Sequence, residues 1–347
     1  MKTDRDLYLF FDGYDELKPH LEGSDEDVLL ALGKPTLIRI PGTEALPRAR
    51  LVAALLHGNE DSGYRAVLEL LRGGERFGFD LWVFLGNLRA AHSDGWFAHR
   101  YLDGQEDFNR VWGLHAPTTR MRRCADAVFD VLDAVGLEGA IDIHNNTGAN
   151  PYYAIVPEPT PESLHLAGAL ADTILRWPLR AHTLMEVLSD RCPAVSVESG
   201  LPGLPDNHAY AGSALRRFLA MDEPGVETPV GPRLVFEMRH RVVVRPEVPF
   251  VFGGQLTEDL DLVLVPGLDA ANFGMLLAGT VLGHVHPGAA MPLLVTDMQG
   301  RETTERFLAI RHDGRLVLTE DLTPVMFTTT ALQTRRDCLC YFARRRA

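Results

Sequence analysis

Between residues 50 and about 220, short apolar runs alternate with longer amphipathic segments. The short runs predict buried strands, whereas the longer segments repeat their apolar residues every three or four positions and predict helices. The expected strands are 50–56, 80–87, 139–145, 152–156 and 194–200, and the expected helices are 62–74, 118–136, 161–175 and 207–221. This alternation predicts an α/β fold with a mainly parallel mixed sheet and helices on both faces.

The pattern changes after DEPGVETPVGP at 222–232, a stretch rich in proline, glycine and acidic residues that is typical of a linker. Runs of β type follow, among them RLVFEMRHRVVVRP, and HDGR between two such runs is a hairpin signal. A chain of 347 residues is long enough for two domains. We predict an α/β domain over 1–225 and a smaller β-rich domain over 233–347.

Composition narrows the class of protein. The net charge of −13 gives no support to nucleic-acid binding or to binding of an anionic membrane. The first residues do not resemble a signal peptide, and no uninterrupted apolar run approaches the ~20 residues of a membrane helix. The four cysteines are scattered, so we expect a reduced, cytoplasmic protein. A homo-oligomer remains open.

Three ionisable clusters stand where predicted strands run into loops. LLHGNE contains His57 and Glu60, IDIHNNTG contains His144, and VSVESG contains Glu198. Each has a structural alternative, because Glu60 could simply begin a helix, His144 could be an ordinary strand-end residue and Glu198 could pair with an arginine. In open α/β sheets, however, ligands bind beyond the carboxyl ends of the strands. Three such clusters at one sheet edge therefore predict a functional site.

The residue types at this edge suit a metal ion. An imidazole and a carboxylate three positions apart at a helix start, as in His57 and Glu60, can share one cation. His144 completes a His₂Glu set with an open position, the pattern of a catalytic zinc site, and we expect one zinc ion per chain. Asp142, on the same strand face as His144, could support this site or take part in the chemistry. Glu198 is the candidate general base for water.

The segments HGNE, FNR at 108–110, DIHNNTG and VESG occur in an order that resembles the succinylglutamate desuccinylase/aspartoacylase family, a branch of the zinc carboxypeptidase superfamily. The resemblance spans about 50–220. It implies a zinc-carboxypeptidase-like fold and hydrolysis of an amide bond. It also implies that His57, Glu60 and His144 bind zinc, and that Glu198 activates the attacking water.

The segment RYLDGQEDFNR resembles the part of the family that contacts substrate. The resemblance implies that Asn109 and Arg110 hold the carboxylate of the amino-acid half, and that Arg100 helps to polarise the scissile carbonyl. We also expect Asn145 to contact the substrate. A planar guanidinium suits a carboxylate, although Arg110 could instead lie on a solvated face. Arg100 and Arg110 are ten residues apart, a longer spacing than in the family, and Phe108 stands where leucine is usual.

Three functions agree with these residues. The first is a zinc-dependent deacylase for a small anionic N-acyl amino acid. The second is a metallocarboxypeptidase or a peptidoglycan-type amidase, which would use the same residues. The third is a non-catalytic binding protein that retains the pocket. The complete ligand set and the base candidate argue against the third.

Overall fold

The computed structural model describes residues 6–45, 48–114, 116, 118–178, 180–226 and 233–346. The chain divides into two compact units. Unit 1 comprises 1–145, 152–174 and 179–233, and unit 2 comprises 146–151, 175–178 and 234–347. Two short internal segments thus group with the C-terminal residues, and the domain bounds of 1–225 and 233–347 stay a prediction. Residues 227–232 of the expected linker lie outside the described residues.

Unit 1 is built on a mixed sheet with strand order β1-β2-β4-β3-β5-β8-β6, and β7 follows β6. The bounds are β1 (Leu9–Asp12), β2 (Thr36–Ile40), β3 (Ala49–Ala54), β4 (Asp80–Leu85), β5 (Leu137–His144), β6 (Tyr153–Val156), β7 (Thr173–Arg176) and β8 (Ala194–Glu198). The central strands β4, β3, β5 and β8 are parallel, whereas β2–β4 and β6–β8 are antiparallel pairs. The predicted mainly parallel sheet is confirmed.

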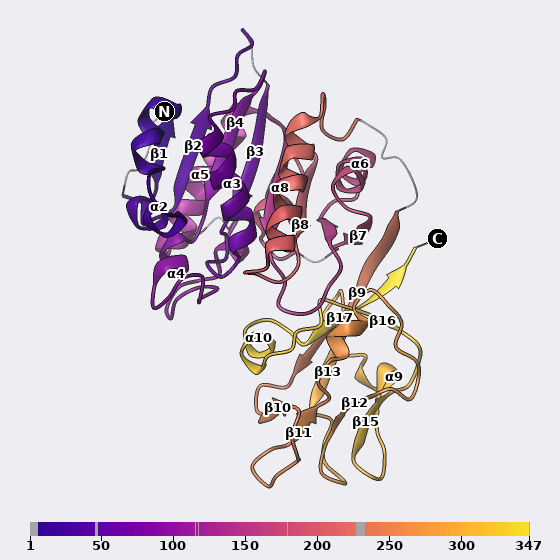
Figure 1. Ribbon diagram of the computed structural model, residues 1–347. Helices are drawn as coiled ribbons and strands as arrows, with labels where there is room; N and C mark the ends of the chain where they lie inside the picture. Colours follow the sequence, from indigo (N-terminus) through magenta and orange to yellow (C-terminus); the bar gives the residue numbers. More distant parts are fainter. Residues whose placement is uncertain are drawn as a thin grey trace. The chain divides into compact units, whose positions relative to one another are not determined.

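Helices cover both faces of this sheet, as predicted. They are α1 (Tyr14–Leu17), α2 (Asp25–Leu32), α3 (Asp61–Gly73), α4 (Leu88–His92), α5 (Arg120–Val135), α6 (Pro161–Leu170), α7 (Leu184–Leu188) and α8 (Pro205–Ala220), with 3₁₀ turns η1 (Lys18–His20) and η2 (Phe108–Arg110). Helices α3 and α8 lie side by side on one face (Figure 1). On the other face, α5 and α7 bury their apolar residues against alternate residues of β3, Leu51 and Ala53.

One predicted helix is wrong in its second half. The expected helix over 161–175 ends at Leu170, and Thr173–Arg176 forms strand β7. Ala171 has the extended φ and ψ of −145° and 152° that stop the helix. The β-branched Thr173 and Ile174 favour a strand, but a short apolar run does not by itself separate helix from strand. Strands β1 and β2, before residue 50, had no counterpart in the sequence prediction.

Unit 2 is rich in strands, as predicted. Its elements are β9 (Leu234–Val244), β10 (Phe250–Phe252), β11 (Leu262–Leu264), η3 (Leu268–Ala271), β12 (Val281–His284), β13 (Leu293–Asp297), α9 (Thr304–Phe307), β14 (Leu308–Ile310), β15 (Arg315–Leu318), β16 (Thr323–Val325), α10 (Ala331–Arg336) and β17 (Cys340–Arg345). Strand β9 pairs with β13 and β17, and β17 pairs with β16. A five-stranded sheet has the order β10-β11-β12-β15-β14. The HDGR hairpin is confirmed, because β14 and β15 pair antiparallel on either side of it.

No helix among the described residues is long and apolar enough to cross a membrane.

Gly63, in the first turn of α3, lets this helix approach β3 and β5 closely. A Cβ atom at this position would lie 2.8 Å from the carbonyl oxygen and 2.9 Å from the Cβ of Ile143, and 3.2 Å from the Cβ of Ala54. We expect Gly63→Ala to lower the free energy of unfolding by about 1–3 kcal/mol through overpacking. Urea unfolding measures this change.

Gly212 in α8 is the matched control, because a Cβ there would meet nothing within 4 Å. We expect Gly212→Ala to raise the free energy of unfolding by about 0.5–1 kcal/mol, since alanine is the better helix former. A Gly63→Ala variant as stable as the wild type would contradict the close packing of α3 on the sheet.

Candidate metal centre

The loop that carries His57 and Glu60 leaves the sheet through a strained turn. Leu55, the first residue after β3, has a φ of 56°, a left-handed conformation that is costly for a bulky side chain. Glu60 is the N-cap of α3, and its N–H donates to the carbonyl of His57 at 3.3 Å. The pair therefore lies in the turn that leads into α3, at the helix start as predicted. This turn brings the two side chains together.

Gly58, within the same loop, holds it against the segment that contains Arg100. The N–H of Gly58 donates to the carbonyl of Arg100 at 2.9 Å. A Cβ at position 58 would lie 2.6 Å from the backbone nitrogen of Ala91 and 2.7 Å from the carbonyl carbon of Ala90. Only glycine fits this approach.

The side chains of His57, Glu60 and His144 converge. Oε1 of Glu60 lies 2.7 Å from Nδ1 of His57, and Oε2 lies 2.6 Å from Nδ1 of His144. All three are at most 5 % exposed. Their ligand atoms lie within 4.8 Å of one another, and in the described part of the chain no other group of three His, Cys, Asp or Glu does so. The sequence prediction that these residues meet is confirmed by this geometry.

Two further carboxylates contact the Nε2 atoms of the two histidines. Oδ1 of Asp107 is 2.9 Å from Nε2 of His57, and Oδ2 of the fully buried Asp142 is 3.0 Å from Nε2 of His144. Asp142 thus has the supporting position that the sequence suggested. Asp107 was missed, although a carboxylate two residues before Asn109, in the segment already singled out, was the available signal.

The donor set fits a divalent cation. A neutral imidazole has one N–H, so it cannot donate to carboxylates at both of its nitrogens. In His57 and His144 the Nε2 atom faces an outer carboxylate, which leaves the Nδ1 lone pair as a metal ligand. This carboxylate–imidazole–metal arrangement orients many zinc-binding histidines. A cation would also offset the buried negative charge of Glu60, Asp107 and Asp142.

The surroundings shift the pKa values of Glu60 and Glu198 in opposite directions. Burial acts to raise the pKa of Glu60, but the contacts with His57 and His144 outweigh burial and lower this pKa. Burial raises the pKa of Glu198 to about 8. Glu60 is therefore a constant anion, suited to bind a cation. Glu198 has a pKa near neutrality, suited to exchange a proton.

Glu198 ends β8 beside the cluster. It is the register partner of His144 on β5 and, on its other side, of Tyr153 on β6. Residues directly opposite one another on paired strands point to the same face, so these three form one row across the sheet. Tyr153 is fully buried and also lies at this edge. The sequence did not show whether its side chain would reach the site.

Three substrate-binding candidates also reach this edge. Arg100 contacts Asp107 through Nε at 3.0 Å and Nη2 at 2.9 Å, and its Nη1 lies 3.6 Å from Glu60. Nδ2 of Asn109 lies 3.4 Å from Nε2 of His144. Arg110 is half-buried, and its Nη1 donates to the carbonyl of Asn109 at 2.9 Å. Their roles toward a substrate stay predictions.

Asn145 has a different environment. Its Oδ1 accepts from the N–H of Ser62 at 3.0 Å, and its Nδ2 lies 2.9 Å from Oγ of Ser62 and 2.9 Å from the carbonyl of Gly200. It also contacts Oγ of Ser199. These contacts join β5 to α3 and to the loop after β8. They favour a structural role over the predicted contact with substrate.

Residues 45–182 match the family model of the succinylglutamate desuccinylase/aspartoacylase catalytic domain. The predicted family resemblance is confirmed. The matched segment contains the three converging side chains and Arg100, Asn109 and Arg110, and the match supports a deacylase-type hydrolase. A search of curated proteins gives no match to the sequence.

Solved structures share the fold at low sequence identity. Succinylglutamate desuccinylase from Chromobacterium violaceum is 16% identical, with a TM-score of 0.57 over 92% of this chain and 90% of the other. A succinylglutamate desuccinylase/aspartoacylase from Rhodobacter sphaeroides is 13% identical, with a TM-score of 0.59 over 90% and 89%. The product-bound ectoine utilization protein from Ruegeria pomeroyi is 14% identical, with a TM-score of 0.53 over 88% of each chain.

If Asp107 orients His57 for a metal ion, Asp107→Asn should weaken zinc binding. We expect a loss of about 10–100-fold in affinity, the usual effect of removing a partner of a ligating histidine. Competition with a chromophoric chelator measures it. Glu106→Gln is the control, because Glu106 contacts Arg122 and Thr119 instead of the cluster. Equal zinc affinity in Asp107→Asn and the wild type would contradict this arrangement.

Proposed function

We propose that the chain is a zinc-dependent amidohydrolase that deacylates a small anionic N-acyl amino acid. The observation that carries the proposal is the buried group of His57, Glu60 and His144 with Glu198 on the adjacent strand. The family match supports the reaction class. The name succinylglutamate desuccinylase, which two of the relatives carry, suggests a succinyl group as one candidate for the part that is removed.

His57, Glu60 and His144 would hold one zinc ion per chain. When bound, zinc supplies a Lewis acid that polarises a carbonyl and acidifies water. Asp107 and Asp142 fix the ring orientations through the Nε2 atoms.

Glu198 would manage the proton. Its carboxylate takes a proton from water as the water oxygen bonds to the amide carbon, and it returns that proton to the leaving nitrogen as the C–N bond breaks. The pKa of about 8 that burial gives this carboxyl lies near neutrality, where both transfers are feasible, and a bound cation would lower it.

Arg110 and Asn109 would bind the carboxylate of the amino-acid half. Arg110 is half-buried, so its guanidinium is partly shielded from water, and the fork of N–H donors matches a carboxylate. Asn109 is anchored because its Oδ1 accepts from the N–H of Leu184 at 2.9 Å. Arg100, 3.6 Å from Glu60, would help to polarise the carbonyl.

Glu198→Gln tests the base. The amide fills nearly the same volume but cannot accept the proton, so we expect kcat to fall by about 10²–10⁴-fold. Zinc content, measured by atomic emission, should remain that of the wild type. Turnover near the wild-type rate would show that another group is the base.

Arg110→Lys tests the binding of the substrate carboxylate. Lysine keeps the charge and loses the fork, so we expect KM for an N-acyl amino acid to rise by about tenfold. The corresponding N-acyl amino-acid amide, which lacks the carboxylate, should show no such difference. Arg122→Lys is the control, because Arg122 lies on α5 and its guanidinium contacts Glu106. An unchanged KM in Arg110→Lys would remove Arg110 from the substrate site.

A screen of substrates tests the function as a whole. We expect succinyl and acetyl amino acids to be hydrolysed, with activity lost on chelation and regained with zinc. If peptides or peptidoglycan fragments are hydrolysed faster than N-acyl amino acids, the carboxypeptidase or amidase alternative is favoured. The absence of both zinc and activity in all assays would favour a binding protein.

A further inference from the structure

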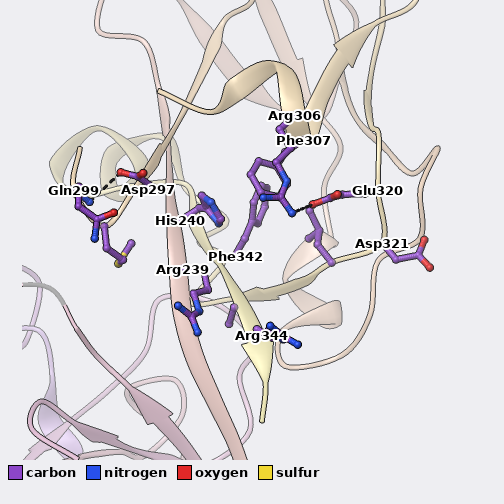
Figure 2. A pocket seen from close by; sticks show the side chains of 13 residues that line it. Arg239, His240, Asp297, Gln299, Arg306, Phe307, Glu320, Asp321, Phe342 and Arg344 are labelled. Atoms are coloured by element: carbon purple, nitrogen blue, oxygen red, sulfur yellow. Dashed lines mark hydrogen bonds and ion pairs between the residues drawn. The ribbon is translucent and has the colours of Figure 1, made fainter. Parts of the chain in front are cut away.

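Unit 2 contains a cavity of about 260 Å³ lined by arginines. The lining residues are Arg239, Arg344, Arg345 and Arg346. Arg239 and Arg344 also line a neighbouring cavity of about 470 Å³, where they lie on adjacent strands at one end (Figure 2). Neither cavity is lined by a residue of the metal cluster.

The pairing of β9 with β17 creates this cluster. Arg344 is opposite Glu237, and two pairs further along β17 Phe342 is opposite His240. The register shifts between Phe342 and Ala343, so Arg239 is the extra residue of a bulge on β9. A bulge turns a side chain out of the regular alternation, and bulges are common next to functional sites. Residues distant in sequence thus reach one cavity.

The positive charge of the cluster exceeds the negative charge that contacts it. One carboxylate, that of Glu237, contacts Arg239 at 3.0 Å and Arg176 at 3.6 Å, and it also contacts Arg346. Among residues 6–45, 48–114, 116, 118–178, 180–226 and 233–346, none forms an ion pair or hydrogen bond with the side chain of Arg344 or Arg345. The four lining arginines are exposed, so water and salt screen part of their mutual repulsion, and an anion bound between them would lower it further. The chain as a whole carries a net charge of −13, so this concentration is a local exception.

The larger cavity is also lined by three carboxylates, Asp297, Glu320 and Asp321. There Arg306 contacts Glu320 at 3.2 Å and lies over the ring of Phe307, with its Cζ 4.8 Å from the centroid (Figure 2). The ring of His240 packs against the ring of Phe307, with 4.4 Å between the ring centroids. An anionic ligand would therefore bind at the end formed by Arg239 and Arg344.

We propose that these arginines form a binding site for a compact anion with two or more carboxylate or phosphate groups. Guanidinium forks bind either group through paired hydrogen bonds. The volume of the cavity suits a small molecule, and the strongly negative net charge opposes a long nucleic acid. The site is independent of the proposed hydrolysis, because its lining residues and those of the metal cluster do not overlap.

The test uses the full chain and isothermal titration calorimetry, with pyrophosphate and citrate as probes. We expect at least one probe to bind the wild type, and R344Q/R345Q to bind it at least about tenfold more weakly, since the charged hydrogen bonds of two guanidinium groups are lost. R311Q/R315Q is the matched control. It removes the same charge from exposed residues flanking the β14–β15 turn and should bind as the wild type does.

The outcomes separate the sources of the ligand. Binding of pyrophosphate alone supports a phosphate ligand, binding of citrate alone supports a polycarboxylate, and binding of both supports selection by charge. No binding of either probe to the wild type would overturn the proposal. An equal loss in R311Q/R315Q would also overturn it, because it would trace the affinity to net charge. If circular dichroism shows that R344Q/R345Q does not fold, R344Q alone has the same expected direction.

Discussion

The contact of one buried carboxylate with two imidazoles is the interaction on which unit 1 depends. Glu60 lies between His57 and His144, whose backbones belong to the exits of β3 and β5. These strands are neighbours and parallel, so their carboxyl ends meet at one edge. Gly63 lets α3 pack closely on these strands, and Gly58 lets the HGNE loop pack closely on α4. This packing positions Glu60 between the two histidines.

Charge then assigns different chemistry to similar side chains. The histidines lower the pKa of Glu60, whereas burial raises the pKa of Glu198. Two carboxylates whose environments separate their pKa values are the usual sign of distinct roles in a catalytic site. Burial acts to raise the pKa of Asp107, but Arg100 and His57 outweigh burial and lower this pKa. The Asp107 carboxylate can therefore orient His57 from the outer side of the cluster. The proposed hydrolase follows from this division between ligand and base.

The sequence predicted the strands β3, β4, β5, β6 and β8, the four longest helices of unit 1 and the convergence of His57, Glu60 and His144, because strand ends and polarity changes are local signals. It did not predict the contact of Asp107, whose loop is positioned by tertiary packing instead of by periodicity. It also could not reveal that the side-chain amide of Asn145 forms hydrogen bonds with neighbouring backbone and hydroxyl groups. The arginine cavity was equally hidden. The basic C-terminal segment was visible in the sequence, but the bulge that adds Arg239 to it depends on strand register.

The central claim is that three side chains bind one zinc ion through the two Nδ1 atoms and the Glu60 carboxylate. Diffraction from zinc-soaked crystals, recorded on both sides of the zinc absorption edge, tests it most directly. The account predicts one strong anomalous peak per chain in contact with Nδ1 of His57, Nδ1 of His144 and an oxygen of Glu60. A peak bound instead through the Nε2 atoms, or no peak at this cluster with zinc at saturating concentration, would contradict it.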